Sequence, residues 1–124
     1  MLNDTSVMAT IAVKDLAVAR DFYEDKLGLE PDIVEEPGAL AYRSAGSSLL
    51  VYESRYAGTN QATAATWEVG DIEQEVKRLK DKGIKFERYD LPGITRQGDL
   101  HVSGKTRAAW FKDPDGNILA IVGH

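Results

Sequence analysis

The sequence contains no cysteine, which excludes disulfides, thiolate metal sites and cysteine nucleophiles together. It also contains no apolar run of about 18 residues, so no helix that spans a membrane is predicted. Residues 1–6 lack the basic and apolar regions of a signal peptide. We therefore expect a cytoplasmic protein with no membrane partner.

An excess of basic residues is missing as well. The 20 acidic residues outnumber the 15 lysines and arginines, the net charge is -5, and the basic residues are scattered along the chain. Nucleic-acid binders usually carry a basic stripe, so nucleic acid is not an expected partner. The chain has 124 residues, of which 43% are hydrophobic. This length and composition predict a single globular domain with a hydrophobic core.

The chain reads as a repeat of one unit. The sequence Val-Lys-Asp-Leu at 13–16 recurs as Val-Gly-Asp-Ile at 69–72, and in each copy the aspartate is a candidate helix N-cap. Apolar residues at helical spacing follow, and a glycine is expected to end each helix. Three strands then complete each unit, which predicts a first module over 7–55 and a second over 62–122.

The second unit contains one connection that reads as a tight turn and one that reads as a long loop. Asp-Pro-Asp-Gly-Asn at 113–117 is tight-turn chemistry, because proline pre-sets φ and glycine supplies a positive φ. Residues 91–105 hold one proline and three glycines and are expected to form a long polar loop. The expected strands are 7–13, 29–36, 39–43 and 48–52 in the first unit, and 62–69, 84–89, 106–111 and 117–122 in the second.

The size of the repeat has a structural consequence. A unit of about 60 residues buries too little surface to be stable alone, so two units should pair their sheets. The concave face between them would be the natural binding cleft. The predicted fold class is α+β, with two tandem βαβββ modules that form a curved mixed sheet around a cleft.

This order of motifs resembles the vicinal oxygen chelate superfamily, which includes glyoxalase I, extradiol dioxygenases, and fosfomycin- and bleomycin-resistance proteins. The resemblance rests on the motif at 13–16, on Ala-Arg-Asp-Phe-Tyr at 19–23, on Leu-Gly-Leu at 27–29 and on Phe-Lys-Asp-Pro-Asp-Gly-Asn at 111–117. It covers almost the whole chain. It implies the fold and a homodimer, but no particular activity, because this fold hosts many.

Metal enzymes of that superfamily place their ligands at fixed positions. The resemblance puts a histidine seven residues before the aspartate that opens each helix, and a glutamate three residues after the final turn, with a counterpart in the first half. Here these positions hold Met8, Ala64, Ala120 and Val51, none of which offers an imidazole or a carboxylate. We therefore expect no metal and no other cofactor, and glyoxalase I or dioxygenase activity is disfavoured.

Without a metal, the floor of the cleft is apolar and small, which suits a hydrophobic or aromatic ligand held by packing. Trp67 and Trp110 are candidates for stacking on such a ligand, and core packing is the alternative for each. The predicted ligand-binding residues are Met8, Val51, Ala64, Trp67, Trp110, Ala120 and Tyr52.

Catalytic candidates are few. His101, in the predicted loop over 91–105, is a candidate acid or base, and that loop is a candidate lid; an exposed loop histidine is the alternative. Glu53, close to Val51, is the other candidate, and a solvated carboxylate is its alternative. No serine-histidine-aspartate triad or phosphate-binding loop is evident.

These observations predict a metal-independent protein that sequesters or carries an apolar or aromatic small molecule, in the manner of the bleomycin-resistance proteins. Two alternatives stay open. One is a glyoxalase-like isomerase or lyase that acts without the usual metal, and the other is a structural or regulatory dimer without ligand chemistry.

Overall fold

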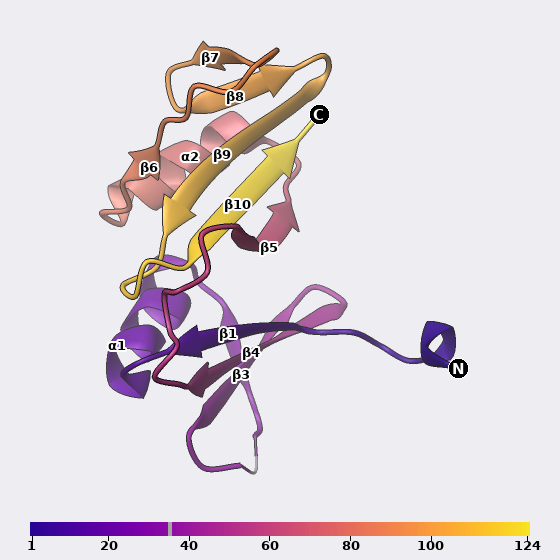
Figure 1. The fold of residues 1–124 in the computed structure, drawn as a ribbon, viewed down its shortest axis with the longest axis vertical. Helices are drawn as coiled ribbons and strands as arrows, with labels where there is room; N and C mark the ends of the chain where they lie inside the picture. Colours follow the sequence, from indigo (N-terminus) through magenta and orange to yellow (C-terminus); the bar gives the residue numbers. More distant parts are fainter. Residues whose placement is uncertain (35) are drawn as a thin grey trace.

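The computed structural model describes residues 1–34 and 36–124 and shows two modules, each built from a sheet and a helix (Figure 1). The first sheet has the strand order β1-β4-β3-β2, in which β1 and β4 are parallel and the other neighbours antiparallel. The strand expected over 29–36 is shorter than predicted, and residue 35 lies outside the described residues. The elements are η1 (Leu2–Asp4), β1 (Ala9–Val13), α1 (Leu16–Arg20), η2 (Asp21–Lys26), β2 (Glu30–Asp32), β3 (Ala39–Ser44) and β4 (Ser47–Glu53).

The second sheet repeats this plan with additions. Its order is β5-β10-β9-β8-β7, with β6 also paired to β9, and β5 and β10 are parallel as β1 and β4 are. The mixed α+β architecture predicted from the sequence is therefore confirmed. The elements are β5 (Thr63–Glu68), α2 (Ile72–Asp81), β6 (Phe86–Glu87), β7 (Thr95–Gln97), β8 (Leu100–Ser103), β9 (Thr106–Lys112) and β10 (Ile118–Gly123).

The stretch over 91–105 differs from its prediction as a loop. It contains the hairpin β7–β8, which extends the second sheet beyond β9. Gly98 makes the tight turn of this hairpin with φ of +64°, and Leu100 behind it is buried. The glycines here are turn residues of short strands rather than signs of a mobile segment.

The predicted helix starts are confirmed in both modules. The carboxylate of Asp15 accepts hydrogen bonds from the backbone N–H groups of Ala17 and Val18, and that of Asp71 accepts one from Gln74. Each bond satisfies an N–H group that the first turn of a helix leaves unpaired. The first helix is short because it continues into η2, a π-helical segment in which the N–H of Leu27 donates to the carbonyl oxygen of Phe22, five residues earlier.

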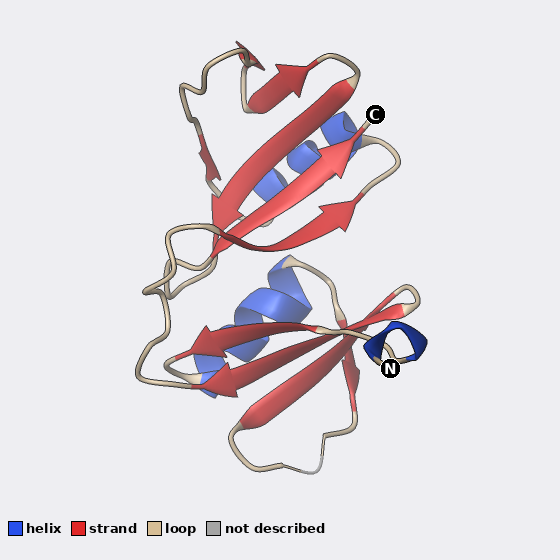
Figure 2. Ribbon diagram, turned by 45° about the vertical axis from the view of Figure 1, so that its right-hand side comes forward, coloured by secondary structure: helices blue, strands red, loops and turns tan. Residues whose placement is uncertain are grey.

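One hydrophobic core runs through both modules. In Figures 1 and 2, α2 lies across one face of the second sheet, and α1 and η2 lie along one face of the first sheet, with one end of this helical segment toward the second module. Phe22 of η2 stands edge-on to Tyr23 and approaches Phe111 of β9, with ring centroids 6.4 Å apart. None of the helices in the described part of the chain covers the other face of either sheet, so these open faces are surfaces left for a ligand.

The turn between β9 and β10 fastens the two modules together. The buried carboxylate of Asp113 accepts hydrogen bonds from the Tyr23 hydroxyl at 2.7 Å and from the Asn117 side-chain amide at 2.8 Å. The same Asn117 amide donates to the Ala12 carbonyl oxygen of β1 at 2.7 Å. We refer to Tyr23, Asp113, Asn117 and the Ala12 carbonyl as the module joint.

A second polar anchor holds the β7–β8 hairpin against α2. The carboxylate of Asp99 accepts a hydrogen bond from Lys80 Nζ at 2.8 Å and one from Arg88 Nε at 3.1 Å. The Asp99 side chain is only 10% exposed, whereas both cations are about half exposed. The hydrogen bond from Lys80 is the main reason why the pKa of Asp99 lies below its ordinary value of 3.8.

This anchor predicts a pH-dependent contribution to stability. Asp99→Asn should lower the free energy of unfolding at pH 7 by about 1 kcal/mol, because the two cations are largely solvated. A carboxyl group with a lowered pKa stabilises the fold above its unfolded pKa, and the stabilisation is lost as the pH falls through the folded pKa. Urea denaturation of parent and variant should therefore give stabilities that converge below pH 3.8.

The matched control is Asp90→Asn, because the Asp90 side chain is 94% exposed and forms an ion pair with Arg96 Nε at 3.4 Å. Its stability should stay close to that of the parent at every pH. A constant difference between the parent and Asp99→Asn down to pH 2 would contradict the role assigned to the Asp99 carboxylate.

Candidate functional site

The two faces of the second sheet carry different side chains. Leu119 and Ile121 of β10 belong to the buried core on the side of α2, and Ala120 between them points the other way. Ala120 is paired across the ladder with Trp110 of β9, so both stand on the open face. Trp110 is partly exposed there, and its Nε1 donates to the Thr63 hydroxyl at 3.1 Å.

Three rings gather beside Ala120 and form what we call the aromatic cluster: Tyr89, His101 and Trp110. The His101 ring stands edge-on to Trp110, with centroids 4.7 Å apart and planes at 85°. The Tyr89 ring is also edge-on to Trp110, at 5.6 Å, and lies 5.9 Å from His101. The strand pairing explains this gathering, because His101 of β8 is opposite Ala108 of β9, two residues before Trp110 on the same face.

His101 is not the exposed loop histidine that was one alternative. It lies in β8, and only 3% of its surface is exposed. Its Nε2 accepts a hydrogen bond from the backbone N–H of Tyr89 at 2.9 Å. A neutral imidazole that accepts at Nε2 carries its proton on Nδ1.

Two polar atoms of the aromatic cluster are buried and have no hydrogen-bond partner among residues 1–34 and 36–124. They are His101 Nδ1 and the Tyr89 hydroxyl oxygen. Burial raises the pKa of Tyr89 above its ordinary value of 10.0, and the nearby Glu87 carboxylate adds to this effect, so the phenol keeps its proton at neutral pH. The cluster therefore holds two unused hydrogen-bond donors next to the face of an indole.

Val51 is placed differently from its prediction. It is fully buried in the core of the first module and does not share a surface with Ala120. Thr10 pairs with Leu50 in the first module as Thr66 pairs with Ala120 in the second. The counterpart of Ala120 is therefore Leu50. The alignment of the two halves that predicts Val51 is therefore one residue out of register, and a shift of one residue reverses the face of a strand.

The other positions expected at metal ligands lie at the edges of the sheets. Met8 precedes β1 and is half exposed, and Ala64 sits at the irregularity where the pairing of β5 with β10 shifts by one residue. Within residues 1–34 and 36–124, no group of three or more histidine, aspartate and glutamate side chains could hold a metal ion. The donor set of the usual metal site does not fit this chain, since Leu50, Ala64 and Ala120 offer no side-chain donor.

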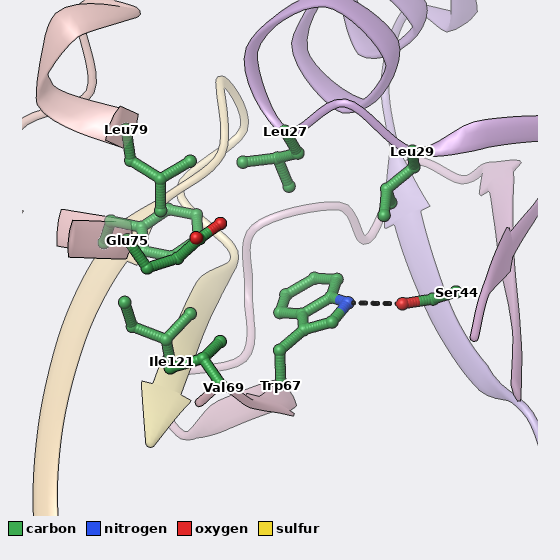
Figure 3. Close-up of a pocket in the computed structure, with 9 residues that line it drawn as sticks. Leu27, Leu29, Ser44, Trp67, Val69, Glu75, Leu79 and Ile121 are labelled. Atoms are coloured by element: carbon green, nitrogen blue, oxygen red, sulfur yellow. Dashed lines mark hydrogen bonds between the residues drawn. The ribbon is translucent and has the colours of Figure 1, made fainter. Parts of the chain in front are cut away.

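Trp67 lies on the opposite face from Trp110, in a cavity of about 200 Å³ between the modules. Figure 3 shows its indole among leucine side chains, with Nε1 donating to the Ser44 hydroxyl at 3.1 Å. Glu75 of α2 reaches the same cavity and pairs with Arg78. Sequence reasoning missed this cavity, because no repeat or spacing indicates where two modules meet. It is lined by Leu27, Leu29, Ser44, Trp67, Val69, Glu75, Leu79, Phe111 and Ile121.

The two catalytic candidates are not brought together. Glu53 is exposed at the end of β4 in the first sheet, whereas His101 is buried in the second. Tyr52 is 39% exposed and points away from the core side of β4, opposite Ala12. Tyr89 contributes a third ring to this site, and nothing in the sequence links it to a histidine in the next hairpin.

Comparison with known proteins supports the architecture described above. The family model described as Glyoxalase/Bleomycin resistance protein/Dioxygenase superfamily matches residues 5–121. No curated protein matches the chain. No helix among the described residues is both long and apolar enough to cross a membrane.

Several solved structures are similar over nearly their whole length. A glyoxalase family protein from Enterococcus faecalis has a TM-score of 0.74 at 20% identity, covering 98% of this chain and 99% of that one. A lactoylglutathione lyase from Agrobacterium tumefaciens has a TM-score of 0.69 at 16% identity, covering 96% and 93%. The fosfomycin resistance protein FosX from Listeria monocytogenes has a TM-score of 0.66 at 17% identity, covering 97% and 90%.

These identities are low, so the structural likeness shows the fold and leaves the activity open. The family model, in contrast, spans both modules and the turn that joins them. On this evidence the chain belongs to the glyoxalase/bleomycin resistance protein/dioxygenase superfamily, also called the vicinal oxygen chelate superfamily.

Proposed function

We propose that this protein binds an apolar or aromatic small molecule on the open face of its second sheet, and that binding needs no metal. The observation that supports this most is the aromatic cluster beside Ala120. The partly exposed indole of Trp110 gives a flat surface for stacking, and its partner across the ladder, Ala120, has a small side chain. The role would be sequestration or transport of the bound compound.

The cavity around Trp67 is the other place where such a molecule could be sought, and its size argues against it. Its volume of about 200 Å³ is below the 300 to 1,000 Å³ that is typical of small-molecule sites. The indole there is also tied to Ser44, and the lining comes from both modules. We interpret it as imperfect packing at the junction of the modules.

Two single-tryptophan variants separate these locations. Trp67→Phe leaves Trp110 as the only indole, and Trp110→Phe leaves Trp67. Titration with nitrobenzene and related substituted benzenes should quench the fluorescence of Trp67→Phe to saturation and leave Trp110→Phe unquenched beyond simple collisions. Trp110→Ala should weaken binding about tenfold, which corresponds to about 1.4 kcal/mol, because the stacking surface is lost.

The opposite pattern would overturn the proposed location. Saturable quenching that survives only in Trp110→Phe would place the ligand in the cavity around Trp67. Elemental analysis of the purified protein gives an independent check on metal independence, since a stoichiometric divalent metal whose removal abolishes binding would contradict that part of the proposal.

A further inference from the structure

The aromatic cluster contains two hydrogen-bond donors that the folded chain does not use. A buried donor without a partner costs about 1 to 3 kcal/mol, so such groups are rare unless something else satisfies them. Here His101 Nδ1 and the Tyr89 hydroxyl lie in the same cluster, and both are unpartnered. Two such groups around one indole point to a ligand that carries an acceptor.

The tautomer of His101 follows from its one hydrogen bond. Because Nε2 accepts from the Tyr89 backbone N–H, the imidazole proton is on Nδ1, and Nδ1 is a donor. The imidazole stands edge-on to Trp110 at 4.7 Å, so Nδ1 belongs to the ring that borders the stacking surface. The Tyr89 phenol is a donor for the separate reason that it stays protonated at neutral pH.

The position of Tyr89 explains how a ligand reaches buried donors. Tyr89 lies in the coil between β6 and β7, and its backbone is held by His101 Nε2 while its side chain belongs to no strand. A small shift of this side chain lets an acceptor enter beside the phenol and the imidazole while the backbone hydrogen bond to His101 Nε2 is kept. An acceptor on the ligand can then receive both donors, as its ring lies against Trp110.

We propose that the ligand is an aromatic compound bearing a hydrogen-bond acceptor next to its ring, such as an aryl ketone, and that His101 Nδ1 and the Tyr89 hydroxyl donate to that acceptor. This inference rests on the proposed function, since it specifies the ligand of the same face. It makes His101 a determinant of ligand specificity and assigns it no proton transfer. The adjacent Ala120 and Ala108 are the small residues beside the bound ring.

A pair of probes of similar size tests the proposal. Acetophenone and cumene differ in that a carbonyl oxygen replaces a methyl group, so only acetophenone can accept the two hydrogen bonds. The measured quantity is the ratio of their dissociation constants, determined by calorimetry or by competition in the Trp67→Phe background. Comparing this ratio between variants cancels the difference in hydration of the two probes.

His101→Gln and Tyr89→Phe are the matched variants. The glutamine amide oxygen can replace Nε2 as the acceptor for the Tyr89 backbone N–H, but glutamine has no group at the position of Nδ1. Phenylalanine removes only the hydroxyl of Tyr89. Each variant should lower the preference for acetophenone over cumene by about three- to tenfold and leave cumene binding nearly unchanged, in line with the loss of one neutral hydrogen bond.

The outcomes distinguish this inference from the function beneath it. If the parent binds cumene, and the ratio of the two dissociation constants is the same in the parent and both variants, the acceptor preference is overturned and the proposed function is kept. Binding of neither probe to the parent protein would overturn both. Nitrogen-15 NMR of the imidazole provides a readout without ligand, because a proton found on Nε2 of His101 instead of Nδ1 would also overturn the proposal.

Discussion

Asp113→Ala is expected to be the most destabilising single substitution considered for this protein, lowering the free energy of unfolding by about 3 kcal/mol or more. The variant removes the acceptor for four hydrogen bonds. Two come from the Tyr23 hydroxyl and the Asn117 amide, and two come from the backbone N–H groups of Asp115 and Asn117. Three of these bonds are largely shielded from water, so their donors would be left unsatisfied.

Urea denaturation followed by far-UV circular dichroism measures this effect, and Asp113→Asn sharpens it. Asparagine keeps an oxygen for the two backbone N–H groups but turns an amide N–H₂ toward Tyr23 and Asn117, which are both donors there. Its stability should therefore lie between those of the parent and Asp113→Ala. Tyr23→Phe should cost less than either, about 1 kcal/mol, since only one bond is lost. Equal stability of all four proteins would contradict the module joint.

Gly58→Ala should be the second largest effect, lowering the free energy of unfolding by about 2 to 5 kcal/mol. Gly58 follows β4 and has a φ of +74°, in the left-handed region that costs other residues about 1 to 2 kcal/mol. A Cβ at this position would also lie 2.0 Å from the carbonyl oxygen of Asp115, in the turn between β9 and β10. This backbone atom cannot rotate away, so the turn has to move, at a further cost of about 1 to 3 kcal/mol.

Gly93→Ala separates the two causes. Gly93 has nearly the same φ, +76°, but a Cβ there would meet no atom within 4 Å. Its loss in the same urea experiment should be about 1 kcal/mol, which is the backbone term alone. An equal loss of unfolding free energy in Gly58→Ala and Gly93→Ala would show that the close approach of Gly58 to Asp115 adds no cost to the substitution.

Local patterns predicted much of the fold. The caps at Asp15 and Asp71 and the turn over 113–117 depend on a few adjacent residues, so their chemistry can be read from the sequence. The hairpin β7–β8 was mistaken for a loop because its strands are short and its glycines mark turns at both ends. With three residues in β7 and four in β8, these strands are too short to show a clear alternation of apolar and polar residues.

The site was harder to predict, because it depends on which face of a strand a residue occupies. Trp67 and Trp110 look alike in the sequence, yet one pairs with Ile121 on the side of α2 and the other with Ala120 on the open side. The sequence repeat predicts Val51 as the counterpart of Ala120, whereas the strand pairing gives Leu50, one residue earlier and on the other face of β4. His101 joins the aromatic cluster through the pairing of β8 with β9, which spacing alone does not reveal.

The module joint has a consequence for the order in which this chain folds. Tyr23 is separated from Asp113 by 90 positions and Ala12 from Asn117 by 105, so the closing contacts join the earliest and latest parts of the domain to be synthesised. Contacts this distant in sequence carry a large loop-closure cost and slow folding. Until β9 and β10 have left the ribosome, the hydroxyl of Tyr23 lacks its acceptor and the face of Phe22 lacks Phe111. The first module therefore cannot complete its packing before the second has been synthesised. Until the β9–β10 hairpin has formed, the nascent chain exposes apolar surface.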